Sequence, residues 1–289
     1  MKRCLACGAD FEGPDWHCPA CGAAPAVRDG FPAFAPALAA SDDGFDASLF
    51  PQLYALETRH FWFRARNALI TWALARYFPQ ARLLLEIGCG TGYVLAGLHV
   101  ARPELALAAS EVSSAGLAFA RSRVPDAEFM QMDARAIPYH AHFDVVGAFD
   151  VIEHIDDDRA VLAEMHRACV PGGGVLITVP QHPSLWSPAD EHAHHRRRYT
   201  AAELRGKLTD AGFRVRRMTS FVSLLLPLMA ASRWLARRNT ARFDPLAELR
   251  IGSVANAALR AVLAAESALI RAGINWPAGG SLLAVAVKT

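Results

Sequence analysis

The sequence predicts an α/β fold with a mostly parallel sheet, and three observations support this prediction. Short apolar runs recur along the chain, at 83–87, 105–110 and 143–149, as expected for buried parallel strands. The first run leads into glycines at 88, 90 and 92, which is typical of a tight turn from a strand into a helix. At 289 residues and 53% hydrophobic composition, the chain can form one large α/β domain with smaller appendages.

The glycine turn predicts a nucleotide-type pocket at the carboxyl end of the sheet. Its spacing is G-x-G-x-G, which differs from the G-x-G-x-x-G of dinucleotide sites, and Glu86 stands two residues before the first glycine. That carboxylate would repel a phosphate but would tolerate a ligand with a cationic amine or sulfonium. The turn also lacks the Gly-Lys-Ser/Thr sequence that holds a triphosphate.

The next two predicted strands also end in carboxylates. The strand at 105–111 ends in Glu111, where an acid can accept hydrogen bonds from ribose hydroxyls. The strand at 127–133 ends in Asp133, which suits an adenine amino group. Together with Glu86, these acids indicate a ligand that combines a cation, a ribose and an adenine.

In this order, the motifs resemble those of class I S-adenosylmethionine-dependent methyltransferases. The resemblance rests on segments 86–92, 143–150 and 171–174 together with Glu111 and Asp133. It covers roughly residues 80–220 and returns at 279–289. Residues 150–154 are similar to the post-strand segment of the quinone-biosynthesis type of small-molecule methyltransferase. The resemblance implies a Rossmann-like, seven-stranded sheet with helices on both faces, and S-adenosylmethionine as cofactor.

The resemblance also implies which residues contact that cofactor. The helical region expected at 46–78 either packs on the sheet or forms a lid, because His60, Arg64 and Asn67 fall on one helical face. Related methyltransferases use amino-terminal helices as lids, so Arg64 is a candidate partner for the cofactor carboxylate. The other expected cofactor residues are Glu86, Gly88, Cys89, Gly90, Gly92, Tyr93, Glu111, Val112, Asp133, Ala134, Phe149 and Asp150.

His154 is the candidate catalytic residue. Methyl transfer is an in-line displacement from a sulfonium, so alignment provides much of the catalysis. An alcohol, phenol or acidic carbon also needs a base, and histidine suits neutral pH. His154 follows a strand end, although a structural histidine beside Glu153 is an alternative, and Asp150 is expected to face the cofactor.

The segment 180–200 contains four of the eleven histidines and three consecutive arginines. It can be an acceptor-binding loop, a solvated basic patch or a metal site, although H-x-H-H lacks the i, i+4 spacing of familiar helical sites. The resembling family often carries an H-R-x-Y-T segment here, which favours the acceptor loop. Thr200 is expected to cap the following helix. The candidate acceptor residues are His182, His195, Arg197 and Tyr199.

The amino-terminal segment 1–25 contains two C-x-x-C pairs, each followed by glycine: Cys4, Cys7, Cys18 and Cys21. This spacing predicts a zinc ribbon with a closed, structural Zn²⁺ site, and a redox pair or incidental cysteines are the alternatives. Cys89 and Cys169 are expected to be packing residues.

Residues 26–45 are rich in proline, alanine and glycine and are expected to form a linker to a methyltransferase domain at 46–289. A helical insertion at about 221–276 separates the last two strands of that domain. Its apolar run at 221–232 is followed by arginines, among them Arg233, Arg237 and Arg242. This part, 221–242, is either a buried cap or a peripheral contact with anionic lipid or a lipid-linked substrate.

Three functions fit these patterns. The first is methylation of oxygen or carbon on a small-molecule, lipid-linked or glycan-linked acceptor. The second is an RNA methyltransferase that holds its target with the ribbon, which a net charge of +2 and the ribbon acids Asp10, Glu12 and Asp15 disfavour. The third is a cofactor-binding scaffold without catalysis. No signal sequence follows Met1, so a cytoplasmic protein is expected, one that can also associate with a membrane.

Overall fold

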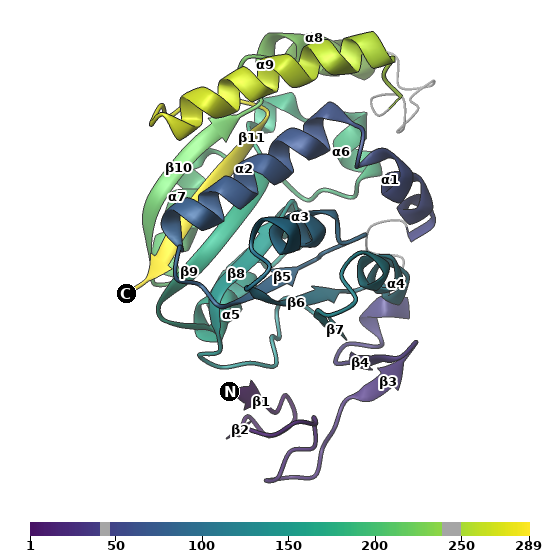
Figure 1. Cartoon of the computed structure of the whole chain (residues 1–289), viewed down its shortest axis with the longest axis vertical. Coiled ribbons are helices and arrows are strands. Elements are labelled where there is room, and N and C mark those ends of the chain that lie inside the picture. The colour runs from purple at the N-terminus through teal and green to yellow at the C-terminus, as the bar shows by residue number, and fades with distance from the viewer. Residues whose placement is uncertain (41–46, 239–249) are drawn as a thin grey trace.

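The computed structural model describes residues 1–40, 47–238 and 250–289, and a mixed sheet forms its centre (Figure 1). The strand order is β10-β11-β9-β8-β5-β6-β7-β4-β3. Strands β5 to β9 are parallel, and β11 runs antiparallel to both of its neighbours. The seven predicted strands are confirmed: β5 (Leu83–Ile87), β6 (Ala106–Glu111), β7 (Glu128–Gln131), β8 (Phe143–Phe149), β9 (Cys169–Pro180), β10 (Phe213–Phe221) and β11 (Ser281–Lys288).

Helices cover both faces of the sheet, as expected. Successive residues of a strand point to opposite faces, so Leu84 belongs to one hydrophobic core and Leu85 to the other. The first core includes residues of α2 (Phe61–Tyr77), α3 (Tyr93–Ala101), α4 (Ser114–Arg123) and α9 (Ser253–Arg271). The second includes residues of α5 (Asp158–Ala168) and α7 (Ala201–Asp210).

The helical region expected at 46–78 is divided into α1 (Phe50–Leu56) and α2. His60 adopts an extended conformation between them, and its Nδ1 accepts a hydrogen bond of 3.3 Å from the backbone N–H of Trp62. His60 is therefore the N-cap of α2 and contributes to the start of the helix rather than to a polar stripe along it.

The segment 26–45 is not a simple linker, and this prediction is wrong for its first half. β3 (Ala26–Arg28) and β4 (Phe31–Ala33) form a hairpin, and β4 pairs with β7. Asp29 and Gly30 have φ of 52° and 80°, the positive values that a two-residue hairpin turn requires. The pair Asp29-Gly30 is a sequence signal for such a hairpin, which the linker prediction did not take into account. Residues 41–46 of the expected linker lie outside the described part of the chain.

The amino-terminal cysteine module packs directly against the main sheet region. Its small sheet consists of β1 (Lys2–Arg3) and β2 (Asp10–Phe11). The backbone N–H of Arg3 donates to the carbonyl of Pro138 at 2.9 Å. The Trp16 ring makes edge contacts with Phe34 and Tyr139, at centroid distances of 4.6 and 5.3 Å.

The insertion contributes α8 (Leu226–Arg238) and α9, at the opposite end of the long axis from the cysteine module (Figure 1). The most apolar 18-residue window of α9 has a mean hydropathy of 1.3 and is 17% buried, so length and composition alone would allow this helix to cross a membrane. In the structure α9 packs against α2 and β10. The buried Glu266 of α9 accepts hydrogen bonds of 2.7 Å from the backbone N–H groups of Ser223 and Leu224.

Candidate cofactor and acceptor site

A cavity of about 540 Å³ lies at the carboxyl ends of β5, β6 and β8, and residues of α1 and α2 also line it. This is the position where ligands bind in open α/β sheets. All the predicted cofactor residues except Gly92 and Arg64 line it: Glu86, Gly88, Cys89, Gly90, Tyr93, Glu111, Val112, Asp133, Ala134, Phe149 and Asp150.

The glycines of the turn have different roles. Gly88 has φ of 62°, and a Cβ there would lie 2.6 Å from Val151, so only glycine fits this cavity wall. Gly92 has φ of 74°, and its Cβ would lie 2.7 Å from the Cα of Ala120 in α4. Gly92 therefore allows α3 and α4 to pack closely, which explains its place outside the cavity.

Glu111 is held by the backbone of two segments. Its carboxylate accepts hydrogen bonds from the N–H groups of Gly90 at 3.0 Å, Val112 at 2.8 Å and Ser113 at 3.3 Å. Burial raises its pKa above the usual range. A carboxylate offers about four acceptor positions, so a further donor such as a ribose hydroxyl can still bind.

Glu86 provides a buried acid beside the glycine turn. The residue is 2% exposed, and its Oε2 has no hydrogen-bond partner among the described residues. Burial is the main cause that raises the pKa of Glu86 to about 8. A cationic ligand in the cavity would favour the ionised carboxylate, so this position favours a positively charged group.

Arg66, which the sequence analysis did not select, is the arginine of α2 that reaches this cavity. Its Nη1 donates to Oδ2 of Asp150, and its guanidinium lies 4.6 Å from the centre of the Trp62 ring. Thr178 Oγ1 donates to the same Asp150 oxygen at 3.2 Å. The Nε of Arg66 is buried and has no partner among the described residues.

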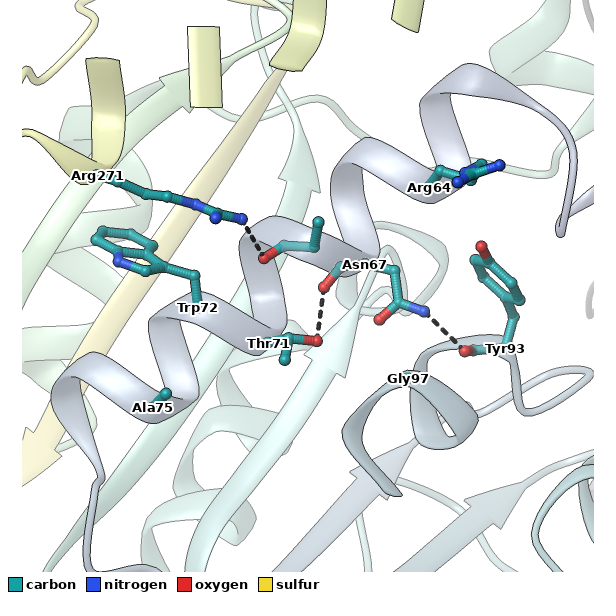
Figure 2. A pocket seen from close by; sticks show the side chains of 9 residues that line it. Arg64, Asn67, Thr71, Trp72, Ala75, Tyr93, Gly97 and Arg271 are labelled. Carbon is teal, nitrogen blue, oxygen red and sulfur yellow. Dashed lines mark hydrogen bonds between the residues drawn. The ribbon is translucent and has the colours of Figure 1, made fainter. Parts of the chain in front are cut away.

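Arg64 lines a separate groove of about 480 Å³ with Asn67, Thr71 and Arg271 (Figure 2). Asn67 Nδ2 donates to the carbonyl of Tyr93 at 2.9 Å, so this face of α2 meets α3. Residues two apart on a helix point about 200° apart, which places Arg64 and Arg66 on opposite sides. The proposed cofactor contact therefore moves from Arg64 to Arg66.

Two further acids on the cavity wall have ionic partners. Asp133, the candidate adenine contact, accepts from Arg135 Nε at 3.0 Å and Nη2 at 2.8 Å. Glu57, at the end of α1, accepts from Thr91 Oγ1 at 2.5 Å and Arg123 Nη1 at 2.8 Å. The role of Glu57 was not recognisable from the sequence, because this network joins three segments that are distant along the chain. It fixes α1 beside the glycine turn.

His154 and His195 line the other end of the cavity, with their ring centroids 4.8 Å apart. Burial, with a further contribution from His195, lowers the pKa of His154 to about 3, so this imidazole is neutral at pH 7. Glu153 beside them is completely buried, and burial raises the pKa of its carboxyl well above the usual range. A pKa of about 3 makes His154 alone a weak base.

The other three candidate acceptor residues lie outside the cavity. Tyr199 is fully buried and donates to Asp158 Oδ2 at 2.5 Å, and Arg197 Nη1 lies 2.9 Å from the same oxygen. His182, with φ of 62°, donates from its backbone N–H to the carbonyl of Tyr199 at 2.9 Å. These contacts indicate that the side chains of Tyr199 and Arg197 fix the loop conformation rather than meet an acceptor, and that the backbone of His182 does the same. The predicted cap is confirmed, because Thr200 Oγ1 accepts from Glu203 N–H at 3.1 Å.

The loop positions His195 through a buried ion-pair network. Asp190, in α6 (Pro188–His192), lies 2.9 Å from His195 Nδ1 and accepts from Arg198 Nε at 2.7 Å. Both Asp190 and Arg198 are buried, and neither was among the predicted site residues. A buried charge pair of this kind becomes recognisable only when the fold brings the partners together.

The four amino-terminal cysteines form a compact cluster. The Sγ atoms of Cys4 and Cys21 are 3.6 Å apart, and those of Cys7 and Cys18 are 3.7 Å apart. Four thiolates about 2.3 Å from one tetrahedral Zn²⁺ would be about 3.8 Å from one another. The sulfur positions therefore fit a zinc ion with no open coordination position.

Comparison with known families gives one extended match. Residues 54–217, more than half of the chain, match a family model described as a methyltransferase domain. This match includes the strand-end acids, the glycine turn and the His195 loop.

The curated relatives match over part of their length. A Mycobacterium tuberculosis protein described as an S-adenosylmethionine-dependent methyltransferase is 35% identical over 165 residues, which are 55% of this chain and 57% of the relative. A trans-aconitate 2-methyltransferase from an Azoarcus species is 30% identical over 46% of this chain and 50% of its own. A norajmaline N-methyltransferase from Rauvolfia serpentina is 34% identical over 37% of this chain and 39% of its own.

Solved structures show the same fold at low identity. A chain from the complex between the Haloferax volcanii Trm112 methyltransferase activator and a methyltransferase has a TM-score of 0.56 and 21% identity, covering 83% of this chain and 96% of its own. The [4+2]-cyclase SpnF has a TM-score of 0.51 and 22% identity, covering 78% and 82%. The second structure illustrates that this fold also supports chemistry other than methyl transfer.

Proposed function

The chain belongs to the methyltransferase domain family, and on that premise we propose that it transfers the methyl group of S-adenosylmethionine to a small-molecule acceptor. The observation that supports this most strongly is the cavity in which Glu86, Glu111 and Asp133 meet beside the glycine turn. S-adenosylmethionine would supply a methyl group bonded to a sulfonium. The relatives named for trans-aconitate and norajmaline methylation support small acceptors.

We call the end of the cavity that contains Glu86, Glu111 and Asp133 the donor end, and the end that contains His154 and His195 the acceptor end. The residues of the donor end have distinct proposed roles. Glu111 binds the ribose hydroxyls, because its carboxylate is held at the end of β6 by the backbone N–H groups of the turn. Arg66 reaches the cavity from α2 and is the proposed partner of the cofactor carboxylate. Glu86, buried and without a partner on Oε2, favours the cationic part of the ligand.

The acceptor end is proposed to act on an oxygen or carbon nucleophile. His154 was the predicted base, but burial lowers its pKa too far for efficient proton removal by this residue alone. We therefore assign activation of the acceptor to Glu153, His154 and His195 together.

Calorimetry with S-adenosylhomocysteine, followed by transfer of a radiolabelled methyl group to a panel of hydroxyl, carbon-acid and amine compounds, tests this function. We expect saturable binding of one ligand per chain and labelled product from a hydroxyl or carbon acceptor. Absence of binding by folded protein would refute the proposal. Labelling of amines alone would refute the assignment to oxygen or carbon.

We also propose that the cysteine cluster holds one structural Zn²⁺ ion. The sulfur separations of 3.6 and 3.7 Å support this proposal, as do the turns in which Gly8 and Gly22 donate to the carbonyls of Cys4 and Cys18. Thiol modification should release one zinc ion per chain and make residues 1–25 sensitive to proteolysis, because so small a module depends on its metal. Unchanged protease resistance after zinc release would contradict a structural role.

We also propose that α8 makes a peripheral contact with lipid, which would suit a lipid-linked acceptor. Leu228, Trp234 and Leu235 are 60%, 50% and 58% exposed. Arg233 and Arg237, expected to meet lipid, instead donate to the segment 184–187, so they fix α8 on the acceptor loop. Arg242 lies outside the described residues. Replacing Leu228 and Leu235 together with Asp should reduce sedimentation with anionic vesicles, and equal sedimentation would refute the contact.

A further inference from the structure

We propose that Glu153, His154 and His195 bind a divalent transition-metal ion at the acceptor end of the cavity. One potential ligand atom from each residue lies within 4.8 Å of the other two. The residues come from two segments, the 3-10 turn Ile152–His154 after β8 and the loop after α6. Both histidines line the cavity, so an ion held here would be accessible from the acceptor position.

The burial of the Glu153 carboxylate without a partner is the first observation that points to an ion. Its side chain is 0% exposed, and neither oxygen has a hydrogen-bond partner among the described residues. Burying a carboxylate without a partner is costly, so such groups either keep a proton, pair with a cation or coordinate a metal. The distance from Glu153 Oε1 to His195 Nε2 is 4.0 Å. This is too long for a hydrogen bond. Two ligand atoms each about 2.1 Å from one tetrahedral ion lie about 3.4 Å apart, so the two groups need to approach by only about 0.6 Å to share an ion.

The two histidines have free nitrogen atoms in suitable positions. Asp190 Oδ1 lies 2.9 Å from His195 Nδ1, which leaves Nε2 on the side of Glu153. A carboxylate that orients the far nitrogen of a histidine is the usual second shell of a metal site. His154 Nδ1 is buried and has no hydrogen-bond partner in the described part of the chain.

The chemistry of these ligands limits the kind of ion. Two imidazoles and one carboxylate suit Zn²⁺, Fe²⁺, Co²⁺ or Mn²⁺, whereas Ca²⁺ and Mg²⁺ prefer sites made of oxygen atoms. Three protein ligands leave at least one coordination position open. The proposed site therefore differs from the four-cysteine cluster, in which the protein supplies all four ligands.

The role of this ion in catalysis rests on the proposed function. An acceptor hydroxyl that binds the open position would lose its proton to solvent water, because the ion stabilises the alkoxide or phenolate. This oxygen would then attack the methyl carbon of S-adenosylmethionine, and the carbon–sulfur bond would break. The electron pair of that bond stays on sulfur, which changes from a sulfonium to a neutral thioether.

A direct binding measurement tests the site without relying on activity. Mn²⁺ added to the full chain is measured by electron paramagnetic resonance, which distinguishes free from bound ion, since Mn²⁺ prefers oxygen and nitrogen ligands to the cysteine cluster. We expect one bound Mn²⁺ per chain. Glu153→Gln and His195→Asn should each weaken this binding at least about tenfold.

The adjacent His194 provides a matched control. It is exposed and has φ of 55°, a conformation that asparagine tolerates, so His194→Asn should retain the wild-type Mn²⁺ affinity. Circular dichroism establishes that each variant is folded, and His195→Asn keeps the test valid if Glu153→Gln does not fold. Equal Mn²⁺ binding by folded His195→Asn and wild-type protein, or none by the wild type, would overturn the proposal.

Calorimetry with S-adenosylhomocysteine on the same samples separates this proposal from the proposed function. Intact cofactor binding without Mn²⁺ binding would reject the metal site alone. Absence of cofactor binding by folded wild-type protein would reject the proposed function, and the measurement of Mn²⁺ binding would still decide whether the metal site exists.

Discussion

The two ends of the cavity satisfy their polar groups in different ways. At the donor end, Glu111 is fixed by three backbone N–H groups from the turn and from its own strand end. At the acceptor end, both oxygens of the buried Glu153 and Nδ1 of His154 lack partners among the described residues. Local backbone geometry therefore fixes the ribose acid of the donor end, although Oε2 of Glu86 at that end also lacks a partner among the described residues. The acceptor end retains buried groups that only a bound species can satisfy.

The largest expected effect concerns Glu86 and pH. Its pKa is raised to about 8, so the folded protein keeps a proton that the unfolded chain loses near pH 4.5. Unfolding then releases a proton from Glu86, so the contribution of this residue to stability falls as pH rises from about 5 to 8. Glu86→Gln should make this fall shallower by up to about 1.4 kcal/mol per pH unit, measured by urea unfolding at several pH values. Parallel curves for the two proteins would contradict the burial of a neutral acid.

The next expected effect concerns the ribose contact at the donor end. Glu111→Ala should weaken S-adenosylhomocysteine binding about tenfold to a hundredfold, because hydrogen bonds to a charged group contribute about 1.5–3 kcal/mol. Glu104→Ala is the control, since Glu104 lies just before the same strand with a side chain that is 62% exposed. Calorimetry should give a lower S-adenosylhomocysteine affinity for Glu111→Ala than for Glu104→Ala. Equal affinities would contradict the assignment of Glu111 as the ribose contact.

Arg66 and Arg64 of α2 should differ in a smaller but clear way. Arg66→Ala removes a guanidinium from the cavity wall and leaves Asp150 without its ion-pair partner, so cofactor affinity should fall about tenfold. Arg64→Ala, two residues away on the opposite face, should change the affinity less than about twofold. A larger loss of cofactor affinity in Arg64→Ala than in Arg66→Ala would instead support Arg64 as the partner of the cofactor carboxylate.

The smallest expected effect on cofactor affinity comes from a substitution at the acceptor end. His195→Asn should leave S-adenosylhomocysteine affinity within about twofold of wild type, because the donor contacts come from other segments. The same substitution should lower the rate of methyl transfer to a hydroxyl acceptor. Calorimetry and a single-turnover assay measure the two effects separately, and a large loss of cofactor affinity would show that the two ends are not independent.

The donor end was predictable because its residues follow strands in the sequence. A buried strand, three glycines and two later strand-end acids specify where Glu86, Glu111 and Asp133 meet. The acceptor end was predictable only in part. Tyr199 and Arg197 lie in a recognisable segment, but Asp158, from the start of α5, binds both of them away from the cavity.

The remaining errors also have physical causes. Arg64 was selected because His60 and Asn67 share its helical face, yet His60 caps α2 and Asn67 binds the backbone of Tyr93. Which face of α2 meets the cavity depends on how the helix packs on the sheet, and periodicity does not specify this. The pairing of Asp190 with His195 and Arg198 likewise depends on tertiary contacts.

The hairpin of β3 and β4 has a consequence for self-association. Ala33 of β4 pairs with Gln131 of β7, so without the hairpin this end of β7 would expose unpaired backbone groups, and such an edge can recruit strands from other molecules. The hairpin moves the open edge to the three-residue β3, which ends in the exposed, charged Arg28. A short, charged edge strand is a poor template for aggregation. Deleting the first 45 residues should therefore promote aggregation of the catalytic part.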